Sequence, residues 1–397
     1  MHNKIIDTIQ KHNTWRNNCI NLVSSENVLS PSAKEAIQSD MGQRYYFDNG
    51  FKLKKSASYS YRGTKYISKI ITIGENIAKE LFNVSYASLY MLSGHQTNLA
   101  ILFAFCKEGD TILCYDPAYG GYPGLDRSKL PKYLGLNVEY IPVELNMAEI
   151  IDTQETKNII EDKKPKLLIL SSANTLFPFP VKELNEVCKR NKCILVYDAS
   201  HPLGLIAGNQ FQNPISEGAD ILLGGTQKSF PGPQGGIILT NNYKNKIQEV
   251  EHFVMVDNSH FNRIAALTVT LLEMKHFGNA YAKQVIKNTK RLAENLEKRG
   301  LPICYKELGY TQSHMFKINT FKDYKTFTRK LEKANIIMDN SGRVGTSEMT
   351  HYGMKEPEIE TIAKFISRIY NNEDAYKVKK DVIEFRKAFQ TIEYCFK

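Results

Sequence analysis

Long apolar runs are missing from this sequence. No stretch supplies the ~18 uninterrupted apolar residues that a membrane-spanning helix needs. The first residues, MHNKIIDTIQKHNTW, contain neither an apolar signal-peptide core nor a small-residue cleavage pattern. These absences predict a cytoplasmic protein with no membrane partner.

Paired cysteines are missing as well. The 7 cysteines are an odd number, lie scattered between Cys19 and Cys395, and include no C-x-x-C pair. Disulfide frameworks and structural zinc sites use such pairs. We therefore expect reduced, mostly buried thiols and no metal site.

The charge is unbalanced, with a formal net charge of +10 and a pI near 9.0. Such an excess fits either a nucleic-acid surface or an anionic substrate. Basic residues alternate with acids, as in KNTKRLAENLEKRG (287–300), which is typical of a solvated helix face rather than of a surface that follows phosphates. We therefore favour an anionic substrate and expect no nucleic-acid partner.

Apolar segments of strand length recur in the first two thirds of the 397 residues. They are continuous rather than alternating, as strands buried on both faces are, and helical patterns separate the first three. The expected strands are 111–115, 166–172, 193–200, 220–225 and 235–240, and the expected helices include 96–107 and 181–191. This pattern predicts an α/β fold around a mostly parallel sheet.

The pattern changes after about residue 275, where long amphipathic segments surround short apolar ones, as expected for a separate α+β domain. We predict an N-terminal segment (1–40), a large α/β domain (41–275) and a small C-terminal α+β domain (276–397). In the small domain the expected helices are 280–299, 322–334, 356–370 and a terminal helix, and the expected strands lie near 302–305, 314–318 and 335–339.

Two polar features lie where an α/β sheet binds ligands. In SGHQTNLA (93–100) a glycine turn opens a helix, whose free N–H groups form an anion site. In ILVYDASH (194–201), Asp198 leaves the carboxyl end of a buried strand and faces the ligand crevice. Taken alone, the first also fits an ordinary turn and the second an aspartate that caps the next turn.

The segment GGTQKSFPGPQGG (224–236) surrounds Lys228 with small residues. In a partly desolvated pocket a lysine becomes a nucleophile toward a carbonyl. A phosphate-binding Walker A loop is excluded because Gln227 precedes the lysine and prolines follow it. Pyridoxal 5′-phosphate (PLP) uses all three features: a lysine for the Schiff base, an aspartate for the ring nitrogen and a helix N-terminus for the phosphate.

A fourth feature, SGRVGTSEMTHYG (341–353), places Arg343 among small residues in the second domain. Its guanidinium can bind an amino-acid carboxylate through two parallel hydrogen bonds. A surface arginine in a turn has the same local pattern.

Several motifs occur in the order found in serine hydroxymethyltransferases: LVSSEN, LSGHQTN, GDTILCYDPAYGGY, YDASHPLGLIAG, KSFPGPQGG and GRVGT. Together they cover nearly the whole chain, and the sequence resembles that family of fold-type I PLP enzymes. The resemblance implies a large α/β domain with a mostly parallel sheet, a smaller C-terminal domain, and a homodimer with active sites at the subunit interface.

The resemblance also assigns roles to single residues. Lys228 matches the Schiff-base lysine, Asp198 the partner of the pyridine nitrogen and His201 a contact of the ring oxygen, while Tyr61 matches an active-site tyrosine. The other matches are Ser93, Gly94 and His95 in the phosphate cup, Tyr122 stacked on the ring, Ser172 near the ring, Gln227 before the lysine where the family has histidine, and Ser25 and Arg343 at the substrate carboxylate.

Two further departures concern folate. The family's folate site uses a glutamate in the stretch that corresponds to QRYYFDNGF (43–51), where Phe47 stands at the acidic position unless Asp48 substitutes. A family loop of about ten residues before the arginine is also shortened, because IIMDN leads almost directly into SGR. A pterin needs hydrogen-bond partners in a specific groove, so these losses predict folate independence.

We therefore expect an enzyme that cleaves the Cα–Cβ bond of a β-hydroxy-α-amino acid and releases an aldehyde. The remaining glycine or alanine portion is then protonated by an aldolase or captured by a second aldehyde in a transaldolase. The base that takes the β-hydroxyl proton is His201, Tyr61 or Tyr122. The alternatives are a tetrahydrofolate-dependent serine hydroxymethyltransferase, or decarboxylation, transamination or β-substitution on the same scaffold.

Overall fold

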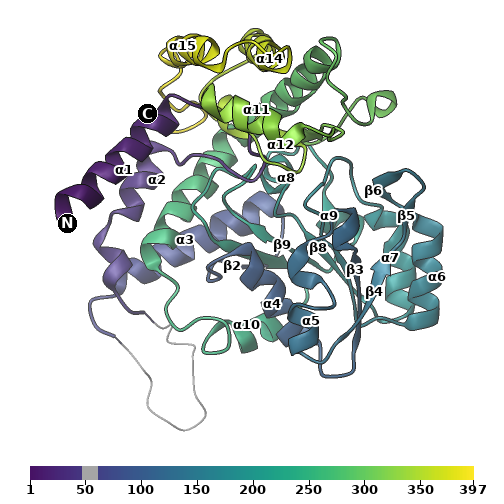
Figure 1. Ribbon diagram of the computed structural model, residues 1–397. Helices are drawn as coiled ribbons and strands as arrows, with labels where there is room; N and C mark the ends of the chain where they lie inside the picture. The colour runs from purple at the N-terminus through teal and green to yellow at the C-terminus, as the bar shows by residue number, and fades with distance from the viewer. Residues whose placement is uncertain (47–60) are drawn as a thin grey trace. The chain divides into compact units, whose positions relative to one another are not determined.

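A computed structural model of the protein describes residues 1–46 and 61–397 (Figure 1). The contacts divide the chain into two compact units. Unit 2 comprises Leu29–Asn279 with Phe396, and unit 1 comprises Met1–Val28 and Ala280–Cys395 with Lys397. The domain boundaries predicted from the sequence, 1–40, 41–275 and 276–397, stay a prediction.

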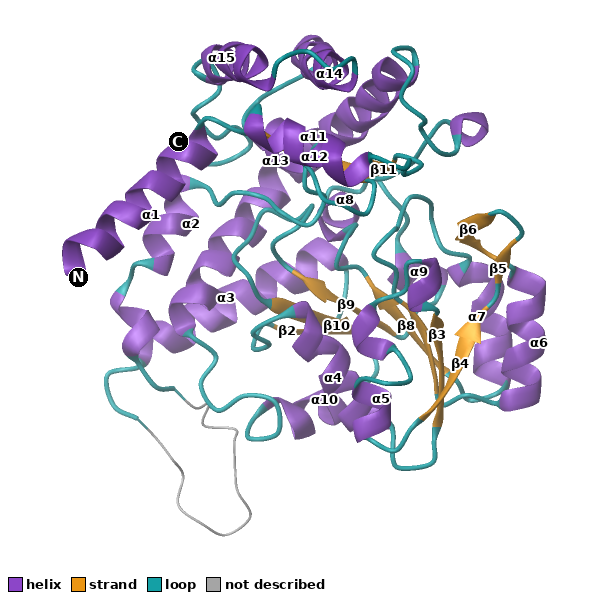
Figure 2. Ribbon diagram, in the orientation of Figure 1, coloured by secondary structure: helices purple, strands orange, loops and turns teal. Residues whose placement is uncertain are grey.

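The helices and strands of unit 2 alternate along most of its sequence (Figure 2). In chain order they are α2 (Pro31–Ile37), η1 (Asp40–Gln43), α3 (Lys65–Phe82), β2 (Tyr86–Ser88), α4 (Gly94–Phe105), β3 (Thr111–Tyr115), η2 (Pro117–Tyr119), η3 (Pro123–Leu125), α5 (Leu130–Tyr133), β4 (Asn137–Ile141), β5 (Val143–Glu144), β6 (Met147–Ile151), α6 (Thr153–Lys163), β7 (Leu167–Leu170), α7 (Val181–Arg190), β8 (Ile194–Asp198), α8 (Leu203–Ala207), α9 (Pro214–Glu217), β9 (Ile221–Gly225), β10 (Gly236–Thr240), α10 (Lys244–Glu251) and the first half of α11 (Phe261–Glu297).

A seven-stranded sheet in the order β2-β10-β9-β8-β7-β3-β4 forms the centre of unit 2. The strands from β9 to β4 are parallel, whereas β10 runs antiparallel to β9 and to β2. Every residue of β7, β8 and β9 is buried, as expected for strands covered on both faces. The predicted α/β fold with a mostly parallel sheet is confirmed.

Amphipathic helices cover the sheet. α7 buries Val181, Leu184, Val187 and Cys188, a spacing that places them on one helix face, and it packs against β8. α4 packs against β9 and β10, and α6 lies beside α7 (Figure 1). Because the parallel strands share a direction, their carboxyl ends meet at one edge of the sheet, which is where open α/β sheets bind ligands.

Unit 1 combines helices with three short strand pairings. Its elements are α1 (His2–Asn17), β1 (Ile20–Asn21), the second half of α11, η4 (Lys306–Leu308), β11 (Met315–Lys317), α12 (Tyr324–Lys333), β12 (Ile336–Ile337), β13 (Arg343–Gly345), α13 (Ser347–His351), α14 (Glu356–Tyr370) and α15 (Ala375–Arg386).

Two of the pairings in unit 1 are regular strands and the third is a single bridge. β1 pairs parallel with β12, and β11 pairs antiparallel with β13. The strand expected near 302–305 is reduced to one isolated bridge between Ile303 and Ile318. The helix expected at 280–299 is the second half of a longer helix, α11, that begins at Phe261.

An apolar core fills unit 1. It includes the fully buried residues Leu292, Phe316, Leu331, Ile359 and Val378. These residues come from α11, β11, α12, α14 and α15, in that order. No helix in the described ranges is long and apolar enough to span a membrane.

Candidate active site

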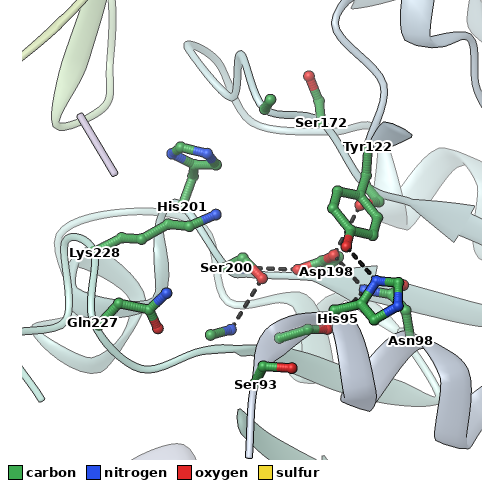
Figure 3. A pocket seen from close by; sticks show the side chains of 14 residues that line it. Ser93, His95, Asn98, Tyr122, Ser172, Asp198, Ser200, His201, Gln227 and Lys228 are labelled. Atoms are coloured by element: carbon green, nitrogen blue, oxygen red, sulfur yellow. Dashed lines mark hydrogen bonds between the residues drawn. The ribbon is translucent and has the colours of Figure 1, made fainter. Parts of the chain in front are cut away.

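A cavity of about 260 Å³ lies in unit 2. Its lining comes from the start of α4, the segment before η3, the ends of β7 and β8, and the segment that follows β9 (Figure 3). Of the residues predicted from the sequence, it brings together Ser93, Gly94, His95, Tyr122, Ser172, Asp198, His201, Gln227 and Lys228.

Asp198 is the last residue of β8 and is only 5% exposed. Its Oδ2 accepts hydrogen bonds from Asn98 Nδ2 at 2.9 Å and from Ser171 Oγ at 2.8 Å. Its Oδ1 accepts from the backbone N–H of Ser200 at 2.9 Å. Three donors from three segments therefore fix the orientation of this buried carboxylate, which faces the cavity (Figure 3).

The start of α4 forms another part of the lining. Ser93 caps the helix, and its Oγ accepts from the backbone N–H of Gln96 at 3.1 Å. A side chain at Gly94 would place its Cβ 3.0 Å from the backbone N of Gly225 and 3.1 Å from Ser200 Oγ. Glycine is favoured here because the helix start approaches the chain before Lys228 closely. The free N–H groups of the helix suit an anion.

Lys228 and His201 lie together on one side of the cavity, and His95 and Tyr122 lie together on the other (Figure 3). Asp198 lies between these two groups (Figure 3). His201 is 4% exposed. Its carbonyl oxygen accepts a short hydrogen bond from Ser229 Oγ, which ties the turn after β8 to the segment that carries the lysine.

Tyr122 is half-buried, and its hydroxyl lies 2.7 Å from Nδ1 of His95. Burial, together with the nearby charge of Asp198, raises the pKa of Tyr122 to about 12. The phenol is therefore protonated at neutral pH.

The cavity fits PLP. Asn98 Oδ1 and Gln227 Oε1 are buried without a hydrogen-bond partner among the described residues, and both side chains line the cavity. Buried polar atoms are rarely left unpaired, so they indicate a polar ligand. A primary amine, a fixed carboxylate and a helix N-terminus then match the cofactor's aldehyde, ring nitrogen and phosphate.

Ser25 and Arg343, the predicted carboxylate-binding residues, belong to unit 1. The backbone N–H of Gly345 donates to the carbonyl of Leu22 at 2.9 Å, so the strand that begins at Arg343 is joined to the segment that leads to Ser25. Arg343 Nε donates to Asp339 Oδ2 at 3.0 Å and to Ser341 Oγ at 2.9 Å. A substrate carboxylate would have to compete with Asp339 for the guanidinium.

Tyr61 is not among the described residues that line the cavity, and its side chain is 45% exposed. Phe47 and Asp48, on which the folate expectation depends, lie outside the described residues. Tyr61 is therefore not brought together with the other predicted site residues, and its active-site role stays a prediction.

Sequence reasoning missed three cavity residues, Asn98, Ser171 and Ser200. Asn98 lies one helical turn after Gly94 and so on the same helix face, a spacing that was visible in the sequence. Ser171 precedes the predicted Ser172, which instead donates to the carbonyl of Gly120 at 3.1 Å.

Reasoning from the sequence also missed Arg263 in the first turn of α11. It is 6% exposed and donates to the carbonyls of Leu89, Tyr90 and Ser259 at 2.7 to 3.3 Å. Burial lowers its pKa to about 10. Arg263 thus holds the chain that leads into the helix N-terminus at Ser93.

Comparisons with known proteins agree with this geometry. A family model described as serine hydroxymethyltransferase matches residues 1–366. The chain belongs to the serine hydroxymethyltransferase family. It is a PLP-dependent transferase of fold type I, and the predicted cofactor is confirmed.

Relatives with the family name are similar over nearly their whole length. The serine hydroxymethyltransferase of Methanopyrus kandleri is 37% identical over 99% of this chain and 94% of its own sequence. That of Pyrobaculum arsenaticum is 36% identical with the same coverage. A crystal structure of L-threonine transaldolase from Pseudomonas fluorescens, in an internal aldimine state, has a TM-score of 0.91 and 26% identity, with 99% of this chain and 93% of that chain covered.

Proposed function

We propose that this member of the family cleaves the Cα–Cβ bond of a β-hydroxy-α-amino acid without folate, as an aldolase or a transaldolase. The observation that carries the proposal is the short connection between β12, which ends at Ile337, and β13, which begins at Arg343. In the serine hydroxymethyltransferases that the sequence resembles, a loop of about ten residues occupies this place and helps to hold the pterin, as the resemblance implies.

The short connection is also closed on itself. Asp339 Oδ1 accepts from the backbone N–H of Ser341 at 2.8 Å and from its hydroxyl at 2.7 Å, while Oδ2 accepts from Arg343. These bonds use the polar groups of the connection internally, so few remain for a pterin ring. The structural similarity to a threonine transaldolase supports the same proposal and favours L-threonine as a first substrate to test.

The residues of the cavity have separate tasks in this proposal. When bound, PLP supplies the electron-withdrawing ring that makes cleavage at Cα feasible. Lys228 provides the amine that holds the cofactor, and Asp198 keeps the ring nitrogen protonated. Asn98, Ser171 and Ser200 orient that carboxylate.

The proton of the β-hydroxyl needs a base. A tyrosine accepts a proton as the phenolate, and a pKa of about 12 keeps Tyr122 protonated at neutral pH. Tyr61 is not part of the described lining. His201, which lines the cavity beside Lys228, is therefore the better candidate, with Arg343 binding the substrate carboxylate in place of Asp339.

The experiment uses purified protein loaded with PLP and supplied with L-threonine in the absence of folate. We expect acetaldehyde release coupled to a dehydrogenase assay, and formation of a new β-hydroxy-amino acid when a second aldehyde is added. Aldehyde release without exchange identifies an aldolase. No cleavage of any β-hydroxy-amino acid without folate would contradict the proposal.

A second candidate function is the tetrahydrofolate-dependent interconversion of serine and glycine. It is favoured by the relatives at 36% and 37% identity that carry this name. The same protein incubated with L-serine, with and without tetrahydrofolate, separates the two. Glycine formation that requires tetrahydrofolate would establish the second function and overturn the first.

A further inference from the structure

Asp339 forms an ion pair with Arg343, the residue predicted to bind the substrate carboxylate. Its Oδ2 accepts a hydrogen bond from Nε of the arginine at 3.0 Å and lies 2.9 Å from Nη2. Nε and Nη2 form one edge of the guanidinium, and a carboxylate binds such an edge through parallel N–H donors. Asp339 therefore occupies a place on Arg343 that a substrate carboxylate can take.

The connection between β12 and β13 holds the aspartate in this position. Oδ1 of Asp339 accepts from the backbone N–H of Ser341 at 2.8 Å and from the Ser341 hydroxyl at 2.7 Å. The next residue, Asn340, accepts a hydrogen bond from Thr328 Oγ1 of α12 at 2.7 Å. The carboxylate of Asp339 is thus held in place before any substrate arrives.

The ion pair is partly shielded from water, because both side chains are 19% exposed. Charges in such surroundings interact more strongly than charges on the open surface. Asp339 offsets the positive charge of the guanidinium, so an incoming carboxylate meets a pair without net charge. Its attraction to Arg343 is therefore reduced, whichever edge of the guanidinium it approaches.

Asp339 is close to Arg343 because the connection is short. β12 ends at Ile337 and β13 begins at Arg343, so the aspartate and the arginine are only four positions apart. The feature that supports folate independence therefore also determines what the arginine contacts in the free protein.

We propose that Asp339 is an internal competitor that limits the affinity of Arg343 for the carboxylate of the amino-acid substrate. The free protein holds the guanidinium on Asp339, and the substrate replaces this contact with its own α-carboxylate. The inference rests on the substrate-binding role of Arg343 in the proposed function. It applies to both candidate reactions, because threonine, serine and glycine all carry an α-carboxylate.

The experiment measures the dissociation constants of the full-length, PLP-loaded protein for glycine and for methylamine, which lacks the carboxylate. Binding is followed by the absorbance of the cofactor, and the ratio of the two constants isolates the contribution of the carboxylate. Asp339→Asn removes the charge and keeps an oxygen that can accept from Ser341. Asp323→Asn is the matched control, because it removes the same charge from an exposed aspartate at the start of α12.

We expect Asp339→Asn to tighten glycine binding about two- to tenfold, the range for a partly shielded ion pair, and to leave methylamine binding within about twofold. In an Arg343→Met background the same change should alter glycine binding by less than about twofold, because the guanidinium is gone. Asp323→Asn should leave both constants unchanged. Circular dichroism checks that the variants fold.

Unchanged glycine binding in Asp339→Asn would overturn the proposal. Weaker glycine binding would overturn it as well, since Asp339 would then orient Arg343 for the substrate, and so would equal changes for glycine and methylamine. If Arg343→Met leaves the ratio of the two constants unchanged, Arg343 does not bind the carboxylate and the competition fails with that role. A protein that binds glycine as expected but cleaves no amino acid without folate contradicts the proposed reaction alone.

Discussion

Replacing Ser171 by alanine removes one of the three donors to the buried carboxylate of Asp198. The bond from Ser171 Oγ to Asp198 Oδ2 is 2.8 Å long, and the two residues are 2% and 5% exposed. A hydrogen bond to a charged group contributes about 1.5–3 kcal/mol. We expect unit 2 of the apoprotein to lose this amount, which corresponds to a fall of about 3–12 °C in its melting temperature.

The assay is a double-mutant cycle followed by differential scanning calorimetry. In an Asp198→Ala background the same Ser171→Ala change should cost less than about 0.5 kcal/mol, because the charged acceptor is gone. Ser172→Ala is the matched control, since that hydroxyl bonds to the carbonyl of Gly120 and its effect should be independent of Asp198. Equal costs of Ser171→Ala in both backgrounds would refute the reasoning.

Three further predictions concern the surroundings of the cavity. Gly94→Ala places a Cβ 3.0 Å from the backbone N of Gly225, so we expect PLP affinity, measured by fluorescence titration, to fall at least about tenfold; an unchanged affinity would contradict the close approach. Arg263→Met leaves buried carbonyls without a donor and should lower the free energy of unfolding, measured by urea titration, by about 2–4 kcal/mol. A loss of less than about 0.5 kcal/mol would contradict the role of Arg263 in holding these carbonyls. Burial raises the pKa of the Glu251 carboxyl above 4.5, although the hydroxyl of Tyr86 donates a hydrogen bond to it. The folded state therefore binds a proton more tightly than the unfolded state, and the protein loses stability as the pH rises from about 4.5 through the raised pKa. Glu251→Gln should remove this loss, and stability curves that run parallel for the two proteins would contradict the assignment.

The sheet was predictable because its strands are short continuous apolar segments. β7 and β8 lie within the predicted ranges 166–172 and 193–200 and are fully buried. The segment near 302–305 has a similar local pattern, but only Ile303 finds a bridging partner, at Ile318. Pairing depends on a distant segment, which the local sequence does not specify.

The site residues that could be predicted are those whose local sequence marks their position in the fold. Asp198 at a strand end and Lys228 among small residues were visible in the sequence, and both line the cavity. The sequence did not show which of Ser171 and Ser172 bonds to Asp198. Neighbouring residues at a strand end point in opposite directions, so a shift of one residue exchanges the two side chains.

The pair of His95 and Tyr122 was not predictable either. The two residues are 27 positions apart, and their contact depends on side-chain orientation and on the space left by Gly124. By contrast, the ion pair between Arg343 and Asp339 has the short spacing of a turn, and the sequence could have indicated it.

The central claim is that the amine of Lys228 bonds to PLP. The most direct test loads the purified protein with PLP, reduces it with borohydride, and locates the pyridoxyl group by mass spectrometry of the digested chain. The account predicts a single stable label on the peptide that contains Lys228, and no label there after Lys228→Gln. A label on another lysine, or none on the wild-type protein, would contradict it.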